Sequence, residues 1–147
     1  MKITICGSIA FYDEMLAVKK QLEQNDHEIK LPPIEVQDEK GILIPVKKYY
    51  EIRKTETKEN SWVWDRKKEA IKNHFDKIAW SEAILVLNYD KNGIQGYIGA
   101  NTLMEMGVAL HLNKPIFLLN KIPEIAYKEE ILGMKTICIN HDLTKIG

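Results

Sequence analysis

The sequence predicts an α/β fold in which helices cover a parallel β-sheet. Five short strand-like segments alternate with five segments of helical periodicity along the chain. The chain opens with a strand, a helix and a second strand, which is a βαβ unit. The third apolar run, residues 83–87, carries no polar residue, as expected for a strand buried on both faces of a parallel sheet.

The predicted elements begin with a strand at residues 2–6, which ends at Gly7-Ser8. A helix follows over about residues 12–25, because apolar residues recur there at helical spacing. Residues 27–31 form a short second strand that ends at Pro32-Pro33. These three elements make the opening βαβ unit.

Residues 32–63 are predicted to leave the sheet as an insertion. They hold three of the five prolines, a turn signal at Lys40-Gly41 and a dense run of charge from Lys47 to Glu59. We expect one amphipathic helix near residues 46–59. The segment is interpreted as a lid or a subunit contact.

The second half of the chain resumes the alternation. A helix over about residues 64–82 buries Ile71, Phe75, Ile78 and Ala79 on one face. The remaining elements are the strand 83–87, a glycine-rich loop 88–99, a helix 101–112, a strand 115–119, a short helix 124–132 and a strand 134–139. We expect strand order 2-1-3-4-5, the flavodoxin-like or Rossmann-like three-layer sandwich, in a single domain covering residues 1–147.

Composition excludes several classes of partner. The chain has 21 lysine and arginine residues and 21 aspartate and glutamate residues, so its net charge is zero. This balance gives no sign of a basic surface that would bind a nucleic acid polymer or a membrane. Cys6 and Cys138 lie in apolar runs without metal-ligand spacing, which favours buried free thiols in a reducing compartment. With no signal peptide or membrane span visible, we expect a cytoplasmic protein.

Two loops should meet where the strand order reverses, namely Gly7-Ser8-Ile9 and residues 88–99. Gly7 allows close approach of a ligand, and Ser8 is a good helix N-cap that leaves amide groups pointing outward. A phosphate or a sugar hydroxyl suits such a turn. The alternative is a tight strand-to-helix connection with no ligand.

Glu105 is the strongest candidate for chemistry. It is the single formal charge among the 21 residues from Gly93 to Asn113, where the charge content of the chain would place about six. A carboxylate in such an apolar helix must be paired, raised in pKa or directed into a cleft. Asn101 and Thr102 lie on the same helical face. The alternative is a structural glutamate that interacts with the helix N-terminus.

Asp76 is a second candidate because it flanks the buried face of its helix. The alternative is a solvated aspartate that pairs with Lys72 or Lys77. Asp90, at the end of the third strand, is a further acid or simply a turn residue. The four histidines, His27, His74, His111 and His141, show no zinc or catalytic spacing, and the aromatic residues Tyr12, Tyr49, Tyr50, Trp62, Trp64 and Tyr97 are candidates for stacking on a base.

Three blocks of sequence resemble the nucleoside 2-deoxyribosyltransferase superfamily, and within it the 2'-deoxynucleoside 5'-monophosphate N-glycosidases. They are Ile5-Cys6-Gly7-Ser8-Ile9 before a helix, Asp76-Lys77-Ile78-Ala79-Trp80-Ser81-Glu82-Ala83 before an apolar strand, and the segment from Gly96 to Ala109 with Glu105. The strand after Lys114-Pro115 is also similar. The resemblance covers the chain except residues 32–63.

The resemblance implies cleavage or transfer at the N-glycosidic bond of a nucleoside or its 5'-monophosphate, without a metal or cofactor. Glu105 would be the nucleophile and Asp76 would handle protons or assist it. Gly7, Ser8 and Ile9 would hold the sugar or a 5'-phosphate, with Gly99, Asn101 and Thr102 close by. The family also implies a homodimer or higher homo-oligomer.

Two alternatives remain. Asn101-Thr102-Leu103-Met104-Glu105 is faintly similar to a motif of the lysine-decarboxylase-like phosphoribohydrolases. A catalytically silent nucleotide-binding or sensor domain is the other, because Thr4 stands where the family has a tyrosine and Ala10 where the monophosphate glycosidases have an arginine.

Overall fold

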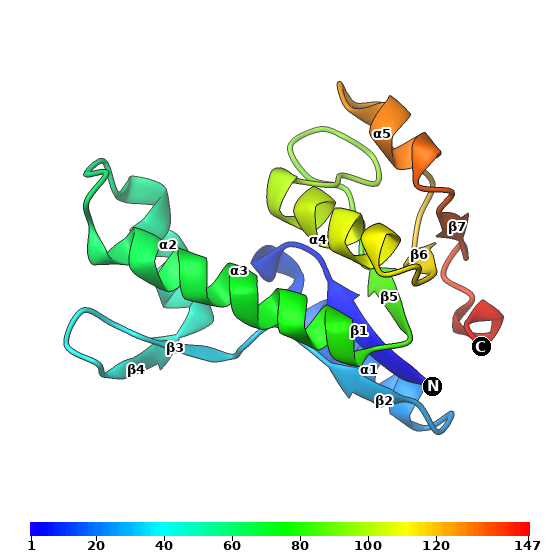
Figure 1. Ribbon diagram of the computed structural model, residues 1–147, viewed down its shortest axis with the longest axis horizontal. Coiled ribbons are helices and arrows are strands. Elements are labelled where there is room, and N and C mark those ends of the chain that lie inside the picture. Colours follow the sequence, from blue (N-terminus) through cyan, green and yellow to red (C-terminus); the bar gives the residue numbers. More distant parts are fainter.

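The computed structural model describes all residues, 1–147, and contains a five-stranded parallel sheet (Figure 1). Its strands are β1 (Lys2–Cys6), β2 (Glu28–Lys30), β5 (Ala83–Val86), β6 (Ile116–Leu118) and β7 (Ile137–Cys138). Their spatial order is β2-β1-β5-β6-β7. This is the order 2-1-3-4-5 of the predicted strands, so the predicted fold is confirmed.

Alternation along the strands creates two cores. Ile3 and Ile5 of β1 face α1 (Tyr12–Glu23), whereas Cys6 faces the opposite layer, which contains α3 (Trp62–Trp80) and α4 (Ala100–His111). β1 pairs with β2 on one side and with β5 on the other, where Ile3 is paired with Ala83 and Ile5 with Leu85, so β1 is an interior strand of the sheet. Burial of these apolar faces on both sides gives the three layers visible in Figure 1.

The helices agree with the predicted ones within a few residues at most ends. α5 (Lys128–Gly133) is shorter than expected, and short 3-10 helices η1 (Ile9–Phe11) and η2 (Leu143–Lys145) stand at the start of α1 and near the end of the chain. Thr4 is fully buried, and its Oγ1 donates a hydrogen bond to the carbonyl of Lys77, 2.8 Å away. This bond fixes α3 against β1.

The insertion at residues 32–63 contains more structure than the one helix predicted. β3 (Glu35–Gln37) and β4 (Leu43–Pro45) form an antiparallel hairpin before α2 (Val46–Thr55). The hairpin turns where predicted, since Gly41 N donates to the Asp38 carbonyl. Its strands are three residues long and mostly exposed, so they lack the apolar pattern by which strands are recognised.

The insertion packs on the N-terminal part of α3, away from the sheet (Figure 1). Ile44, Tyr49 and Val63 form a separate small core, and the Tyr49 hydroxyl donates to the Val63 carbonyl at 2.7 Å. α3 therefore carries the insertion at one end and packs on β1 at the other. None of the helices combines the length and apolar character needed to cross a membrane.

Candidate active site

The candidate site lies at the carboxyl ends of β1 and β5, where the order of the sheet reverses. The chain leaves β1 through Gly7, where an added Cβ would lie 3.2 Å from the Leu87 carbonyl oxygen and 3.3 Å from Met15 Cε. Ser8 then caps η1, with Oγ accepting a hydrogen bond from Ala10 N. The predicted cap and close-packed turn are thus both present.

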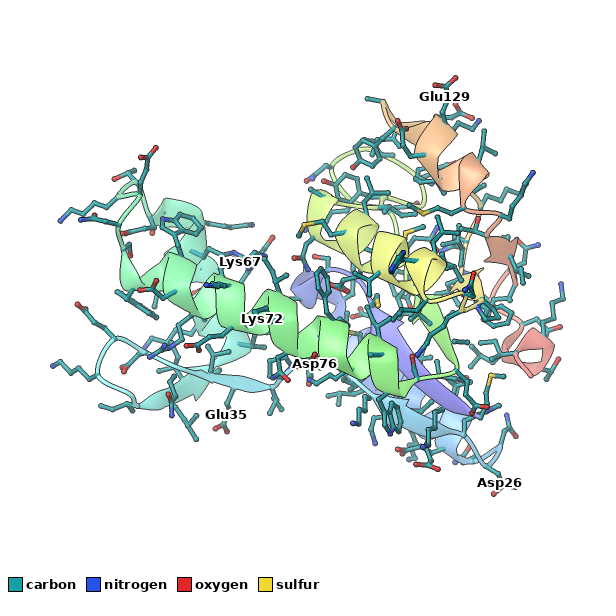
Figure 2. The ribbon with its side chains drawn as sticks, viewed as in Figure 1. Asp26, Glu35, Lys67, Lys72, Asp76 and Glu129 are labelled. Atoms are coloured by element: carbon teal, nitrogen blue, oxygen red, sulfur yellow. The ribbon has the colours of Figure 1, made fainter.

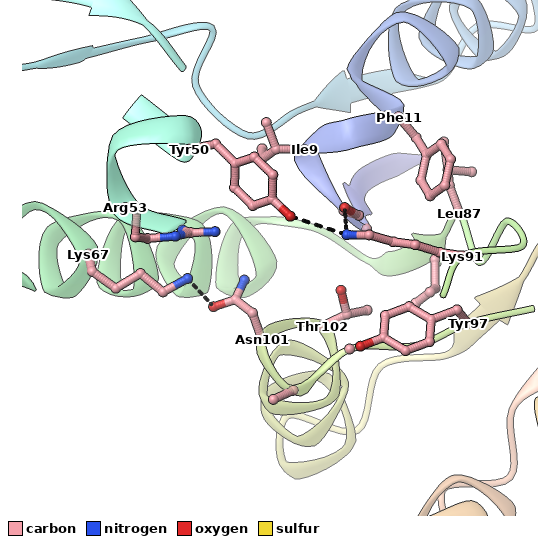
Figure 3. A pocket seen from close by; sticks show the side chains of 15 residues that line it. Ile9, Phe11, Tyr50, Arg53, Lys67, Leu87, Lys91, Tyr97, Asn101 and Thr102 are labelled. Carbon is pink, nitrogen blue, oxygen red and sulfur yellow. Dashed lines mark hydrogen bonds between the residues drawn. The ribbon is translucent and has the colours of Figure 1, made fainter. Parts of the chain in front are cut away.

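A cavity of about 250 Å³ opens beside this turn, and we call it the outer cavity (Figure 3). It is lined by the turn after β1, by α2, by α3 and by the segment from the end of β5 to α4. All six residues predicted to bind substrate line it: Gly7, Ser8, Ile9, Gly99, Asn101 and Thr102. The fold therefore brings together residues that lie more than ninety positions apart.

A second cavity of about 70 Å³, the inner cavity, adjoins the first. Glu105 and His74 line it together with an apolar wall that includes Pro32, Val36 and Ile71. The two cavities share the lining residues Gly7, Ile9, Tyr50, Arg53, Lys67 and Asn101. Glu105 lines only the inner cavity, so a ligand in the outer cavity would approach it past Asn101.

Glu105 is 4% exposed and lies on the buried face of α4 with Thr102 and Met106. Its Oε1 accepts a hydrogen bond from Asn101 Nδ2 at 2.8 Å. Asn101 lies one helical turn before Glu105, on the same face of α4, as the spacing of the two residues predicted. Its Oε2 has no hydrogen-bond partner. Burial raises the pKa of Glu105 to about 7, although the Cys6 thiol, Lys67 and Lys77 oppose the shift.

His74 is the neighbour of Glu105 that the sequence did not indicate. Its Nε2 lies 3.3 Å from Glu105 Oε2, 3.1 Å from the Ile5 carbonyl oxygen and 3.5 Å from Cys6 Sγ. Burial lowers the pKa of His74 to about 4, so the ring is neutral at neutral pH. The Ile5 carbonyl is an acceptor and Nδ1 has no partner, which assigns the proton to Nε2. The one available signal was that His74 lies three residues after Ile71, on the predicted buried face.

Cys6 is fully buried, as predicted, whereas Cys138 is half-buried with Sγ near Asn140 Oδ1. Burial, followed by the charge of Glu105, raises the pKa of the Cys6 thiol well above its usual value, so Cys6 stays protonated. Cys6, His74 and Glu105 offer a sulfur, a nitrogen and an oxygen within 4.8 Å of one another. These donors are the set that could hold a single borderline-soft divalent cation.

The structure does not bring Asp76 to Glu105. Asp76 is exposed on α3 and lines neither cavity (Figure 2). Since successive helical residues are rotated by about 100°, a side chain two positions after the buried His74 points to the other side of the helix. Asp90 is a turn residue, because its Oδ1 accepts a hydrogen bond from Gly96 N at 3.0 Å.

Three cationic side chains line the outer cavity, and no carboxylate does. They are Arg53 of α2, Lys67 of α3 and Lys91 of the loop after β5 (Figure 3). Burial, followed by the charge of Arg53, lowers the pKa of Lys67 to about 8. The sequence did not indicate this group, because its members are separated along the chain by up to 38 residues, and Arg53 and Lys67 each lie within a run of mixed charge.

Aromatic side chains also reach the site. Of the aromatic residues considered for stacking, Tyr50 and Tyr97 line the outer cavity and Tyr49 the inner one, whereas Tyr12, Trp62 and Trp64 line neither. Phe11, which was not predicted, lines the outer cavity and packs against Tyr89 in a tilted arrangement, with 5.0 Å between the ring centroids. The outer cavity thus combines aromatic faces with polar and cationic groups, a combination that suits an aromatic ligand with polar substituents.

No family model and no curated protein matches the chain. A solved structure to which it is similar is described as a 2-deoxyribosyltransferase from the psychrotolerant bacterium Bacillus psychrosaccharolyticus. The identity is 18%, the match covers 80% of this chain and 71% of that chain, and the TM-score is 0.49.

Proposed function

We propose that this chain is an enzyme that cleaves or transfers at the N-glycosidic bond of a (deoxy)nucleoside or its 5'-monophosphate, with Glu105 as the nucleophile. The observation that carries the proposal is the buried Glu105 carboxylate, which lines the inner cavity beside the larger outer cavity at the point where the sheet order reverses. Nucleoside chemistry suits this position because the outer cavity offers aromatic faces for a base and polar groups for a sugar.

In the first step, a Glu105 carboxylate oxygen bonds to the anomeric carbon of the sugar as the C–N bond breaks. The electron pair of that bond leaves with the base, which takes a proton from solvent. The negative charge of Glu105 stabilises the oxocarbenium-like sugar in a dry environment, where charge interactions are strong. In the second step, water or an acceptor base displaces Glu105 and regenerates the carboxylate.

The protonation state of Glu105 suits this role near neutral pH. With a pKa of about 7, about half of the molecules carry the ionised carboxylate at pH 7. Because it is poorly solvated, this carboxylate is a better nucleophile than one in water. The hydrogen bond from Asn101 fixes Oε1 and orients the group.

His74 takes the place beside Glu105 that we had expected Asp76 to occupy. Its neutral ring is held by the Ile5 carbonyl and shields the carboxylate from water on one side. We assign His74 a positioning role, because it contacts Glu105 and is held by β1. The neighbouring Cys6 stays a thiol and does not compete as a nucleophile.

Two further proposals follow from the predicted family. We propose that the chain forms a homodimer or higher homo-oligomer, which sedimentation at working concentration tests, and that it acts in cytoplasmic nucleotide metabolism. The insertion at residues 32–63 supplies Tyr50 and Arg53 to the outer cavity, which supports its assignment as a lid.

The test incubates the protein with ribo- and deoxyribonucleosides and their 5'-monophosphates, with and without an acceptor base. Chromatography then measures free and exchanged bases. Base release by the wild type that is lost in Glu105→Gln supports the proposal, and Asp76→Asn is the matched control that retains activity. Equal release by wild type and Glu105→Gln would overturn the assignment of the nucleophile.

The second candidate is a nucleotide-binding domain without turnover. It is favoured by one observation, namely that Glu105 lines only the inner cavity, whose volume of about 70 Å³ is small for a sugar. This candidate predicts that a nucleotide raises the melting temperature of the protein while no base is released at any enzyme concentration.

A further inference from the structure

The outer cavity has an unusual charge composition. Among its 15 lining residues are Arg53, Lys67 and Lys91, and none is aspartate or glutamate, although the whole chain carries equal numbers of both signs. Three like charges that face one space repel one another, and more strongly where they are partly withdrawn from water. All three side chains are half-buried. Holding these three like charges close together therefore costs electrostatic free energy in the folded protein.

The partners of these cations are all uncharged. Lys91 Nζ donates to Ser8 Oγ at 2.8 Å and to the Tyr50 hydroxyl at 3.3 Å, and Lys67 Nζ lies 3.4 Å from Asn101 Oδ1. The Arg53 guanidinium lies 4.9 Å from the centroid of the Tyr50 ring. None of the three cations forms an ion pair. Neutral groups hold the three charges in place, and the one carboxylate whose charge acts on Lys67 is Glu105, which lines the inner cavity and not the outer one.

The backbone adds donors at the same wall. α4 begins after Gly99, which provides no side-chain cap, and Gly99, Ala100, Asn101 and Thr102 all line the outer cavity. The first amide groups of a helix have no partner within the helix and carry its positive dipole end. The cationic side chains and the start of α4 thus lie around one concave space.

We infer that Arg53, Lys67 and Lys91 form a subsite for the phosphate group of a small phosphorylated ligand. A phosphate monoester carries close to two negative charges and several acceptor oxygens, which match three cations and a helix start better than a single carboxylate would. A concave space of about 250 Å³ suits a small molecule rather than a polymer or a membrane surface.

The subsite depends on the insertion. Arg53 and Tyr50 both belong to α2, and Tyr50 contacts Lys91 across the cavity. Lys91 in turn contacts Ser8 of the turn after β1, so one lysine ties the insertion to the sheet (Figure 3). The insertion thus acts as a specificity element that provides part of the phosphate-binding wall.

The subsite is also linked to the candidate nucleophile. Asn101 contacts Lys67 through Oδ1 and donates to Glu105 through Nδ2. A ligand whose phosphate lies among the cations therefore has its remaining atoms within reach of the inner cavity. Naming the substrate as the 5'-monophosphate rather than the nucleoside rests on the proposed function, whereas binding of the phosphate does not.

The experiment measures binding by isothermal titration calorimetry, so that it requires no turnover. The probes are inorganic phosphate, deoxynucleosides and the matched deoxynucleoside 5'-monophosphates, measured on wild type, Arg53→Gln, Lys67→Gln and Lys91→Gln. Lys72→Gln is the control, since it removes the same charge from an exposed position of α3 outside the cavity (Figure 2).

We expect the wild type to bind at least one monophosphate about a hundredfold more tightly than its nucleoside. Each subsite variant should lose roughly tenfold in affinity for the monophosphate while nucleoside affinity and the Lys72→Gln variant stay unchanged. Inorganic phosphate should compete with the monophosphate. Melting curves identify any variant that fails to fold. Arg53→Lys and Lys91→Arg keep the charge, so these two variants should retain most of the preference for the monophosphate.

Equal affinity for nucleoside and monophosphate throughout the panel would overturn the inference, as would a preference that all three variants retain. Phosphate-dependent binding without base release would leave the subsite in place and overturn the glycosidase proposal instead. Base release from nucleosides with no preference for phosphate would support the glycosidase and overturn the subsite. The two proposals therefore fail separately.

Discussion

His74 Nε2 lies 3.3 Å from Glu105 Oε2, and both side chains are buried between β1 and α4. Burial moves the two pKa values in opposite directions, to about 4 for His74 and about 7 for Glu105. Between these values both groups are neutral, so the contact is not an ion pair over that range of pH. Above about pH 7, Glu105 alone becomes charged, and it does so inside the protein.

Base release should rise with pH around neutrality. Since the nucleophile is the ionised carboxylate, kcat should increase from about pH 6 to about pH 8 with a midpoint near the Glu105 pKa of about 7. The measurement is the pH profile of kcat with saturating substrate in buffers of constant ionic strength. A rate that falls over this interval would indicate that Glu105 acts as an acid instead.

Glu105→Gln should stabilise the folded protein at alkaline pH. The pKa of Glu105 is higher in the folded than in the unfolded chain, so its stabilising contribution is present below the unfolded value of about 4.5 and is lost as pH rises through about 7. The variant avoids this loss and should gain up to about 3 kcal/mol at about pH 8.5. Urea denaturation at about pH 5 and about pH 8.5 measures the difference. If the variant gained the same free energy of unfolding at both pH values, ionisation of the buried Glu105 would not be the cause of the gain.

Replacing His74 should change the pH profile in a way that depends on the size of the new side chain. His74→Ala opens space for water beside Glu105, so the kcat midpoint should move toward acid by roughly one pH unit. His74→Leu fills the space with an apolar group and should keep the midpoint at or above about 7, although both variants leave the Ile5 carbonyl without its donor and should lose about 1–3 kcal/mol of stability. Identical midpoints in the two variants would argue against His74 as a shield.

Gly96→Ala should destabilise the loop before α4. Gly96 has φ of +67°, and an added Cβ would lie 2.6 Å from the Lys121 carbonyl oxygen and 3.2 Å from Asn88 Nδ2. We expect a loss of about 2–4 kcal/mol, from strain and from disruption of the Asn88 hydrogen bonds. Gly107→Ala is the control, because it lies within α4 with no atom near its Cβ and should gain about 0.5–1 kcal/mol. Thermal melts of the two variants in parallel check both signs.

The sheet could be predicted because its inner strands are apolar runs of the length that a buried parallel strand requires, and residues 83–87 illustrate this most clearly. Glu105 could be found because a single charge within an apolar helix is a local feature. The hairpin of β3 and β4 could not be predicted, because its three-residue strands are exposed at alternate positions and include Pro45.

The partners of Glu105 depend on contacts between distant segments. His74 lies 31 residues before Glu105, and helical periodicity can say that it is buried but not what it faces. Asp76 flanks the predicted buried face of the same helix, yet a rotation of about 200° over the two residues after His74 directs it to solvent. The contact of Lys91 with Ser8 spans 83 residues and exists only once β1 and β5 have paired.

β1 is synthesised before both of its neighbours in the sheet, β2 and β5. Its partner β5 begins at Ala83, so after pairing with β2 the nascent chain leaves one edge of β1 unpaired until the insertion and α3 have been synthesised. An unpaired apolar edge of this kind is a target for intermolecular pairing. Folding of this chain should therefore be most vulnerable to aggregation between the synthesis of β2 and β5, and a chaperone would protect it in that interval.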